Sequence, residues 1–207
     1  MPAASRSVRT GGAEVRPDGR RLRGEASRRA IVQAAIRVLS RDGLAAVTHR
    51  AVATEAGVSV ALTTYHFGTL DDLLAAALTE LSRAGATRLA HGTDVARAGE
   101  VSLLDACSGH LIDLLGPRRG EFLADLEIRM AAARNAKIHS AAERADAGFV
   151  ELIDTFTHDR VSAHAIYVAI LGFAIVSVIT SPAPTEQEIR QFMRGILARY
   201  QLLDPTG

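Results

Sequence analysis

The chain has 207 residues, of which 48% are hydrophobic, so it can form one large domain or two smaller ones with a sizeable core. Its only cysteine, Cys107, excludes an intrachain disulfide and a cysteine-based zinc site within one chain. The N-terminus is polar and Arg-rich, without the apolar segment of a signal peptide. We therefore expect a cytoplasmic protein.

The formal net charge of +1 hides an uneven distribution. Residues 1–70 contain eleven Arg and five acidic residues, which gives +6, whereas residues 71–207 contain thirteen basic and eighteen acidic residues, which gives −5. A basic N-terminal third beside an acidic remainder indicates that only the first part faces a polyanion.

Residues 1–23 are rich in Gly, Pro, Ser and Arg and have no apolar periodicity, which is typical of a disordered arm. Its arginines fit either contacts with DNA phosphates and the minor groove or a solvated tail. From about Gly24 to Arg41, apolar residues recur at the spacing of one helix face. Asp42-Gly43 predicts the end of this first helix.

The stretch from Thr48 to Phe67 has the layout of a helix-turn-helix. Thr48 is a good N-cap for a short helix, Gly57 can end it with a positive φ, and Ser59 can cap a second helix over about Val60–His66. We expect the outward face of this second helix to carry small or hydrogen-bonding residues, namely Val60, Ala61, Thr63, Thr64 and His66. Such a face can lie deep in a major groove. The alternative is an ordinary helical hairpin in an α domain.

Apolar periodicity and capping residues predict six further helices. They cover about residues 69–91, 102–115, 119–134, 136–158, 162–180 and 185–200, with a polar loop at 92–100. No strand pattern is found in the sequence. We therefore predict an all-α fold of about nine helices, with a DNA-binding domain over residues 24–70 and a second domain over residues 71–207.

The segment from Ser162 to Thr180 is almost wholly apolar. It is near the minimum length for a membrane span and contains His164, so burial between its own domain and a partner is the alternative that we favour. Together with the last helix it predicts a homodimer formed as a four-helix bundle. The expected interface residues are Ile170, Phe173, Phe192, Met193, Ile196 and Tyr200.

A series of residues follows the first helix: Gly43, Leu44, Thr48, Arg50, Val52-Ala53, Ala56-Gly57-Val58-Ser59, Tyr65-His66-Phe67 and Asp71-Asp72-Leu73-Leu74. Over about residues 24–75 this series resembles the tetracycline-repressor (TetR) family of bacterial regulators. The resemblance implies three DNA-binding helices, a ligand-binding body, and a dimer interface made by the last two helices.

The resemblance also implies roles for single residues. Thr48 would contact a phosphate as an N-cap, and Arg50 would reach a phosphate or a base edge. The positions that approach the bases are Ser59, Val60, Ala61 and Thr63, and those that contact the backbone or pack beneath it are Tyr65 and His66. Thr64 and Leu70 stand where the family usually has a phosphate-binding Tyr and a Lys, and each departure removes a phosphate contact. The Arg-rich arm is hypothesised to compensate.

In such a family the body holds a pocket with a few polar groups among apolar ones. The residues that would line it are His110, Leu114, Phe122, Leu126, Met130, Phe149, His164 and Tyr167. Each of them also fits a surface or core position. The histidines form no metal-binding pattern, and there is no nucleophile motif or phosphate-binding Gly loop, so we expect no enzyme, no metal and no cofactor.

The predicted function is that of a dimeric repressor on a palindromic DNA operator, from which a small molecule releases it. The alternative, motivated by Thr64 and Leu70, is a helical small-molecule-binding or scaffolding protein that no longer binds DNA specifically.

Overall fold

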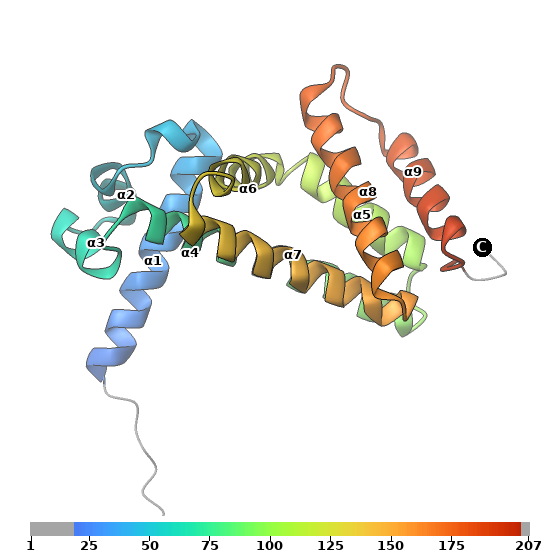
Figure 1. The fold of residues 1–207 in the computed structure, drawn as a ribbon, viewed down its shortest axis with the longest axis horizontal. Helices are drawn as coiled ribbons and strands as arrows, with labels where there is room; N and C mark the ends of the chain where they lie inside the picture. Colours follow the sequence, from blue (N-terminus) through green and yellow to red (C-terminus); the bar gives the residue numbers. More distant parts are fainter. Residues whose placement is uncertain (1–18, 204–207) are drawn as a thin grey trace, which may run out of the picture.

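The computed structural model describes residues 19–203, and within this range all regular structure is helical, with no strand (Figure 1). The predicted all-α fold of about nine helices is confirmed. The elements are α1 (Gly19–Asp42), η1 (Leu44–Ala46, a short 3₁₀ helix), α2 (His49–Ala56), α3 (Val60–His66), α4 (Leu70–Arg97), α5 (Leu103–Leu115), α6 (Arg119–Ala132), α7 (Ala136–Thr157), α8 (Arg160–Ile179) and α9 (Glu186–Arg199).

Two helix boundaries differ from the prediction. Helix α1 begins at Gly19, inside the arm predicted over residues 1–23, and α4 continues to Arg97 through most of the loop predicted at 92–100. The α4 extension is explained by packing: Thr93 is 3% exposed, and a Cβ on Gly92 would lie 3.8 Å from the Ala106 side chain of α5. Contact with α5 therefore outweighs the polar composition of this segment. Residues 1–18 of the predicted arm lie outside the described residues.

The short helices α2 and α3 lie beside α1 at one end of the molecule, and α8 and α9 lie at the other end (Figure 1). Helices α4 and α7 pack against each other along the length between them. One core cluster joins α1, α2, α4, α6 and α7, and a second joins α5, α6, α8 and α9. Helix α6 contributes Ile128 to the first cluster and Phe122 to the second, so it connects both ends.

The predicted caps of the helix-turn-helix are confirmed. The Thr48 side chain accepts a hydrogen bond from the Ala51 backbone N–H at 3.0 Å, and the Ser59 hydroxyl accepts one from that of Leu62 at 3.2 Å. Gly57 ends α2 in the left-handed conformation with φ of 67°. These caps satisfy backbone N–H groups that have no partner inside the helix, which fixes where α2 and α3 begin.

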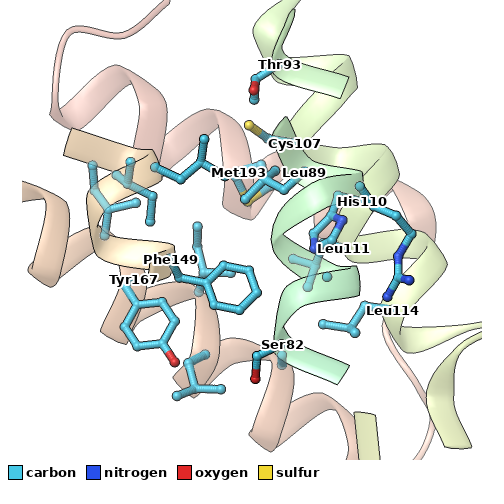
Figure 2. A pocket seen from close by; sticks show the side chains of 18 of the residues that line it. Ser82, Leu89, Thr93, Cys107, His110, Leu111, Leu114, Phe149, Tyr167 and Met193 are labelled. Atoms are coloured by element: carbon cyan, nitrogen blue, oxygen red, sulfur yellow. The ribbon is translucent and has the colours of Figure 1, made fainter. Parts of the chain in front are cut away.

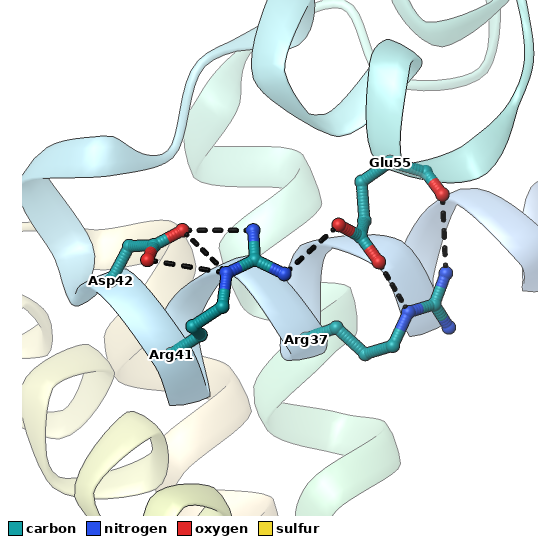
Figure 3. Close-up of polar contacts among 4 residues, drawn as sticks. All are labelled: Arg37, Arg41, Asp42 and Glu55. Carbon is teal, nitrogen blue, oxygen red and sulfur yellow. Dashed lines mark hydrogen bonds and ion pairs between the residues drawn. The ribbon is translucent and has the colours of Figure 1, made fainter.

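An ion-pair network holds α2 against α1 (Figure 3). The Glu55 carboxylate accepts hydrogen bonds from Arg37 Nε at 2.7 Å and from Arg41 Nη1 at 3.1 Å. Arg41 also pairs with Asp42 at 2.9 Å. The hydrogen bonds from Arg37 first, and then from Arg41, lower the pKa of Glu55. The network therefore links α2 to α1 at the protein surface, beside the apolar contacts that the two helices share in the core.

Candidate DNA-binding surface and ligand pocket

Most of the residues predicted to contact DNA are accessible on α2 and α3. Tyr65 is 81% exposed and Val60 is 45% exposed. His66 is half-buried and lies edge-on to the Tyr65 ring, with 5.2 Å between the ring centroids. The other exposed members of the predicted set are Thr48, Arg50, Ser59, Ala61 and Thr64. The surface combines one guanidinium with hydroxyls and small apolar groups, which suits contact with phosphates and base edges.

Thr63 does not belong to this surface, and its predicted role at the bases is wrong. It is completely buried, and its hydroxyl donates a hydrogen bond to the Val60 carbonyl at 2.7 Å. Because a threonine in a helix can satisfy its hydroxyl on a carbonyl of the preceding turn, it can face the core without leaving a polar group unpaired. Neither the polarity of threonine nor the position that the family resemblance assigns to it reveals this burial.

The body contains a cavity of about 160 Å³, lined by residues of α4, α5, α6, α7, α8 and α9 and by Leu202 (Figure 2). Phe149 and Tyr167 lie on one side of it, and His110 and Leu114 on the other. The Phe149 ring stacks on that of Tyr167 with 5.9 Å between the centroids. It also lies against Gly85, where a Cβ would be 3.2 Å from Phe149 Cζ. The glycine thus leaves space for an aromatic ring between α4 and α7.

Five of the predicted ligand-binding residues line this cavity: His110, Leu114, Phe122, Phe149 and Tyr167. The other three do not. Met130 is 70% exposed, His164 is exposed, and Leu126 packs in the core cluster that joins α5, α6, α8 and α9. Apolar periodicity shows which residues of α6 and α8 share a face, but not how each helix is rotated toward its neighbours. The predicted place of these three residues in the pocket is therefore wrong.

Two residues predicted for the dimer interface line the cavity. Met193 is 2% exposed and lines the cavity, and Ile170 lines it as well. The inner sides of α8 and α9 close the pocket, and this explains why both side chains point into the body.

A polar cluster at the edge of the cavity joins the predicted Tyr167 to three residues that the predicted site did not include. Arg129 Nε donates to Asp125 at 2.5 Å, and Arg129 also binds Asp146, which accepts a hydrogen bond from the Tyr167 hydroxyl at 2.6 Å. Burial raises the pKa of Asp125, and the nearby Arg129 partly offsets this effect. The i, i+4 spacing of Asp125 and Arg129 on an otherwise apolar helix face is the signal that could have identified the cluster.

A second polar group lies around His110. Burial, followed by the positive charge of Arg88, lowers the pKa of His110 to about 4, so its ring is neutral at pH 7. Arg88 Nη2 lies 3.5 Å from Glu121 Oε2, and the other Glu121 oxygen accepts a hydrogen bond from Arg118 Nη1 at 3.3 Å. Burial also raises the pKa of the Cys107 thiol to about 11, which makes it a weak nucleophile.

Glu127 connects α6, which lines the cavity, to the end of the molecule formed by α1, α2 and α3. It is on α6, between Asp125 and Arg129, and its carboxylate accepts a hydrogen bond from the Leu44 backbone N–H. A Cβ on Gly43 would lie 3.4 Å from the same carboxylate, and one on Gly120 would lie 3.0 Å from the Ser40 carbonyl oxygen. Helix α6 therefore packs directly against the C-terminal end of α1.

Across residues 19–203, no group of three or more His, Cys, Asp and Glu side chains is placed to hold a metal ion.

In the same range, one helix, α8, is long and apolar enough to cross a membrane by length and composition alone. Ala163, Ile166 and Ala174 of this helix are buried inside the protein, and Tyr167 lines the cavity. These contacts support the interpretation of α8 as a helix packed in its own domain.

Residues 31–77 match the family described as bacterial regulatory proteins, tetR family. The multidrug binding protein EbrR complexed with ethidium is 30% identical to the chain, with a TM-score of 0.70 over 82% of this chain and 98% of that one. EbrR complexed with imidazole is 31% identical, with a TM-score of 0.68, over 82% and 93% of the two chains. A member of the TetR family from Streptomyces coelicolor A3, SCO1917, is 30% identical, with a TM-score of 0.69, over 82% and 97%. The comparison with curated proteins finds no match.

Proposed function

Since the chain belongs to the TetR family of bacterial DNA-binding transcriptional regulators, we propose that it is a repressor which a small molecule releases from a palindromic operator. The observation that carries this proposal is the position of α6. Its Phe122 lines the cavity, and its Glu127 accepts a hydrogen bond from the backbone of Leu44, in the segment between α1 and α2. A molecule that fills the cavity can act on α2 and α3 by displacing this helix.

The proposed division places the DNA-binding domain at residues 24–70 and the ligand-binding and dimerising body at residues 71–207. Arg50 supplies the exposed positive charge at the start of α2, and Thr48 lies beside it at the N-terminus of that helix. Helix N-termini and guanidinium groups both bind phosphate. The remaining proposed DNA contacts are Ser59, Val60, Ala61, Thr64, Tyr65 and His66.

The proposed dimer uses α8 and α9. The outer side of α8 carries four large apolar side chains that are 52–78% exposed, namely Val161, Val168, Val176 and Ile179. Their spacing places them along one face of the helix. Phe173 of α8 stacks on Phe192 of α9 with 4.0 Å between the ring centroids, so the two helices can present one joint surface. A four-helix bundle with a second copy would cover it, with the half-buried Ile196 and Tyr200 at its edge.

The proposed effector is a small molecule bound in the cavity. Structures of the similar EbrR contain imidazole, ethidium, proflavin and malachite green, all of them aromatic. In this chain, the stacked rings of Phe149 and Tyr167 offer an aromatic wall to such a ligand. We propose that the dimer has two arrangements, which differ in the spacing of the two α3 helices, and that only one of them fits the operator. A ligand that binds the other arrangement more tightly lowers the affinity for DNA by the difference in its binding free energy between the two.

A salt-titrated binding assay on the DNA upstream of the protein's own gene tests this function. We expect specific binding with a steep salt dependence, and Arg50→Ala reduces the salt slope by about 1 if Arg50 contacts a phosphate. Arg144→Ala, which removes an exposed charge from α7, is the matched control and leaves the slope unchanged. Weak, sequence-indifferent binding would favour the alternative of a helical small-molecule-binding or scaffolding protein.

A further inference from the structure

One charged side chain in the cavity wall lacks a full set of partners. The Nε–H of Arg88 is buried, and no residue between 19 and 203 accepts a hydrogen bond from it. A different nitrogen of the same guanidinium, Nη2, lies 3.5 Å from Glu121 Oε2, and Glu121 is shared with Arg118. A buried donor without an acceptor is unfavourable, so an acceptor atom supplied by a ligand would gain more here than at a position that is already paired.

His110 adds a second donor at the same place. It lines the cavity from α5, beside α4, which carries Arg88, and the positive charge of Arg88 acts on its ring. A neutral imidazole has one N–H donor and one nitrogen acceptor. No hydrogen bond within residues 19–203 occupies either nitrogen. Arg88 and His110 are therefore the lining residues with N–H groups left for an oxygen atom of a ligand.

The carboxylates of the cavity are already engaged. Asp125 accepts from Arg129 at 2.5 Å, Asp146 binds Arg129 and Tyr167, and Glu121 binds Arg118. The two carboxylates that line the cavity, Glu121 and Asp125, are paired with arginines, so a cationic group would have to compete with Arg88, Arg118 and Arg129 for them. The rest of the lining is mainly apolar and aromatic.

We propose that the effector of this pocket is a largely apolar aromatic molecule carrying an oxygen acceptor, a carbonyl or a carboxylate, which Arg88 and His110 bind. This inference rests on the proposed function, because it concerns the same pocket. It assigns to this chain a preference for acceptor-bearing over cationic aromatic ligands.

Four naphthalene derivatives with the same ring test the inference: acetylnaphthalene, naphthoate, ethylnaphthalene and naphthylmethylammonium. Their affinities for the purified full-length protein can be measured by displacement of a fluorescent anilinonaphthalene sulfonate or by calorimetry. We expect the carbonyl compound, the carboxylate, or both to bind about tenfold or more tightly than the other two, because hydrogen bonds to a charged group have that effect. The order of the first two distinguishes a neutral from an anionic acceptor.

Arg88→Met removes the donors while keeping an unbranched side chain, and it should abolish the preference. Arg83→Met, on the exposed side of the same helix, should retain it. If Arg88→Met does not fold, His110→Phe should reduce the preference in its place. Equal or tighter binding of ethylnaphthalene or the ammonium compound to the wild type, or no binding of any of the four, overturns the inference.

The same four compounds separate this inference from the proposed function. Preferential binding of the acceptor compounds without any release of operator DNA supports the assigned pocket preference and counts against DNA release by ligands of this class. Release of DNA by ethylnaphthalene or the ammonium compound with equal potency contradicts the inference and leaves the function standing.

Discussion

At the scale of single residues, Glu55 is the carboxylate on which two arginines of α1 converge. Arg37 and then Arg41 lower its pKa, so it stabilises the folded state at a pH above its ordinary value, and this stabilisation is lost as the pH falls through the lowered pKa. We expect Glu55→Gln to lower the Tm slightly at neutral pH. Circular dichroism melts over a pH series should show the difference from the wild type disappearing in acid.

Glu25→Gln is the control for this experiment. Glu25 Oε1 pairs with Arg21 Nε at 3.1 Å on the exposed side of α1. Both residues belong to α1, so this pair does not connect two elements. Exposed pairs of this kind contribute little to stability, so this variant should melt like the wild type at every pH. A Glu55→Gln difference that persists unchanged in strong acid would contradict the role given to the carboxylate.

The caps and the inward-facing residues show which residue-scale features a sequence reveals. Thr48 and Ser59 were correctly predicted as caps, because a cap depends on residues within one helical turn. Thr63 and Met130 were placed on the wrong sides of α3 and α6, because the buried side of a helix depends on helices distant in the sequence. The Thr63 hydroxyl can bind a carbonyl of its own helix, and Met130 lies at the edge of the apolar stripe of α6. Neither residue type therefore indicates by itself whether the side chain faces the core or the solvent.

At the scale of elements, α6 is the link between the cavity and α1. Glu127→Ala leaves the Leu44 N–H without its acceptor, so we expect a loss of stability of about 1–3 kcal/mol in denaturant titrations. We also expect the ligand to bind with little change while its effect on DNA affinity becomes smaller, because the contact that transmits the movement of α6 is gone. Operator binding with and without saturating ligand measures this coupling.

Glu127→Gln keeps an oxygen that can accept the Leu44 hydrogen bond, and it should retain most of the coupling and the stability. Glu143→Gln changes an exposed carboxylate on α7 and serves as the control for charge alone. If Glu127→Ala responds to the ligand as strongly as the wild type, the signal does not pass through this contact.

The ends of the elements were predictable to different degrees. The starts of α4 and α9 follow from capping boxes, Thr69 with Asp72 and Thr185 with Glu188, which are local and were predicted correctly. The C-terminal part of α4 was predicted as a loop, since Gly92 and its polar neighbours favour one. Its helical conformation follows from packing against α5, which a reading of the segment alone does not contain.

At the scale of the whole molecule, the cavity is a property of six helices together. Its apolar lining could be anticipated from the apolar stripes, and five of the eight predicted side chains are there. Of its polar part, His110 and Tyr167 were predicted, whereas the grouping of Arg88 and Glu121 around His110 was not, because these residues come from three separate helices. Their proximity depends on how α4, α5 and α6 cross, and no periodicity encodes these crossings.

The exposed apolar side of α8 leads to the last prediction, which concerns the assembly. Val168 and Val176 are 52% and 54% exposed, and in the proposed dimer both are covered by the second copy. A glutamate at either position would be buried without a partner, with a cost on the order of 2 kcal/mol or more. We expect Val168→Glu and Val176→Glu to be monomeric in sedimentation equilibrium at concentrations where the wild type is dimeric.

Thr87→Glu, an exposed position on α4, is the matched control and should leave the dimer intact. Because a palindromic operator is bound by two α3 helices at once, the monomeric variants should lose specific affinity while keeping the helical circular dichroism spectrum of the wild type. Variants that remain dimeric would place the interface elsewhere. Variants that become monomeric yet bind the operator as tightly as the wild type would show that one copy suffices, and the two-fold arrangement would then play no part in DNA recognition.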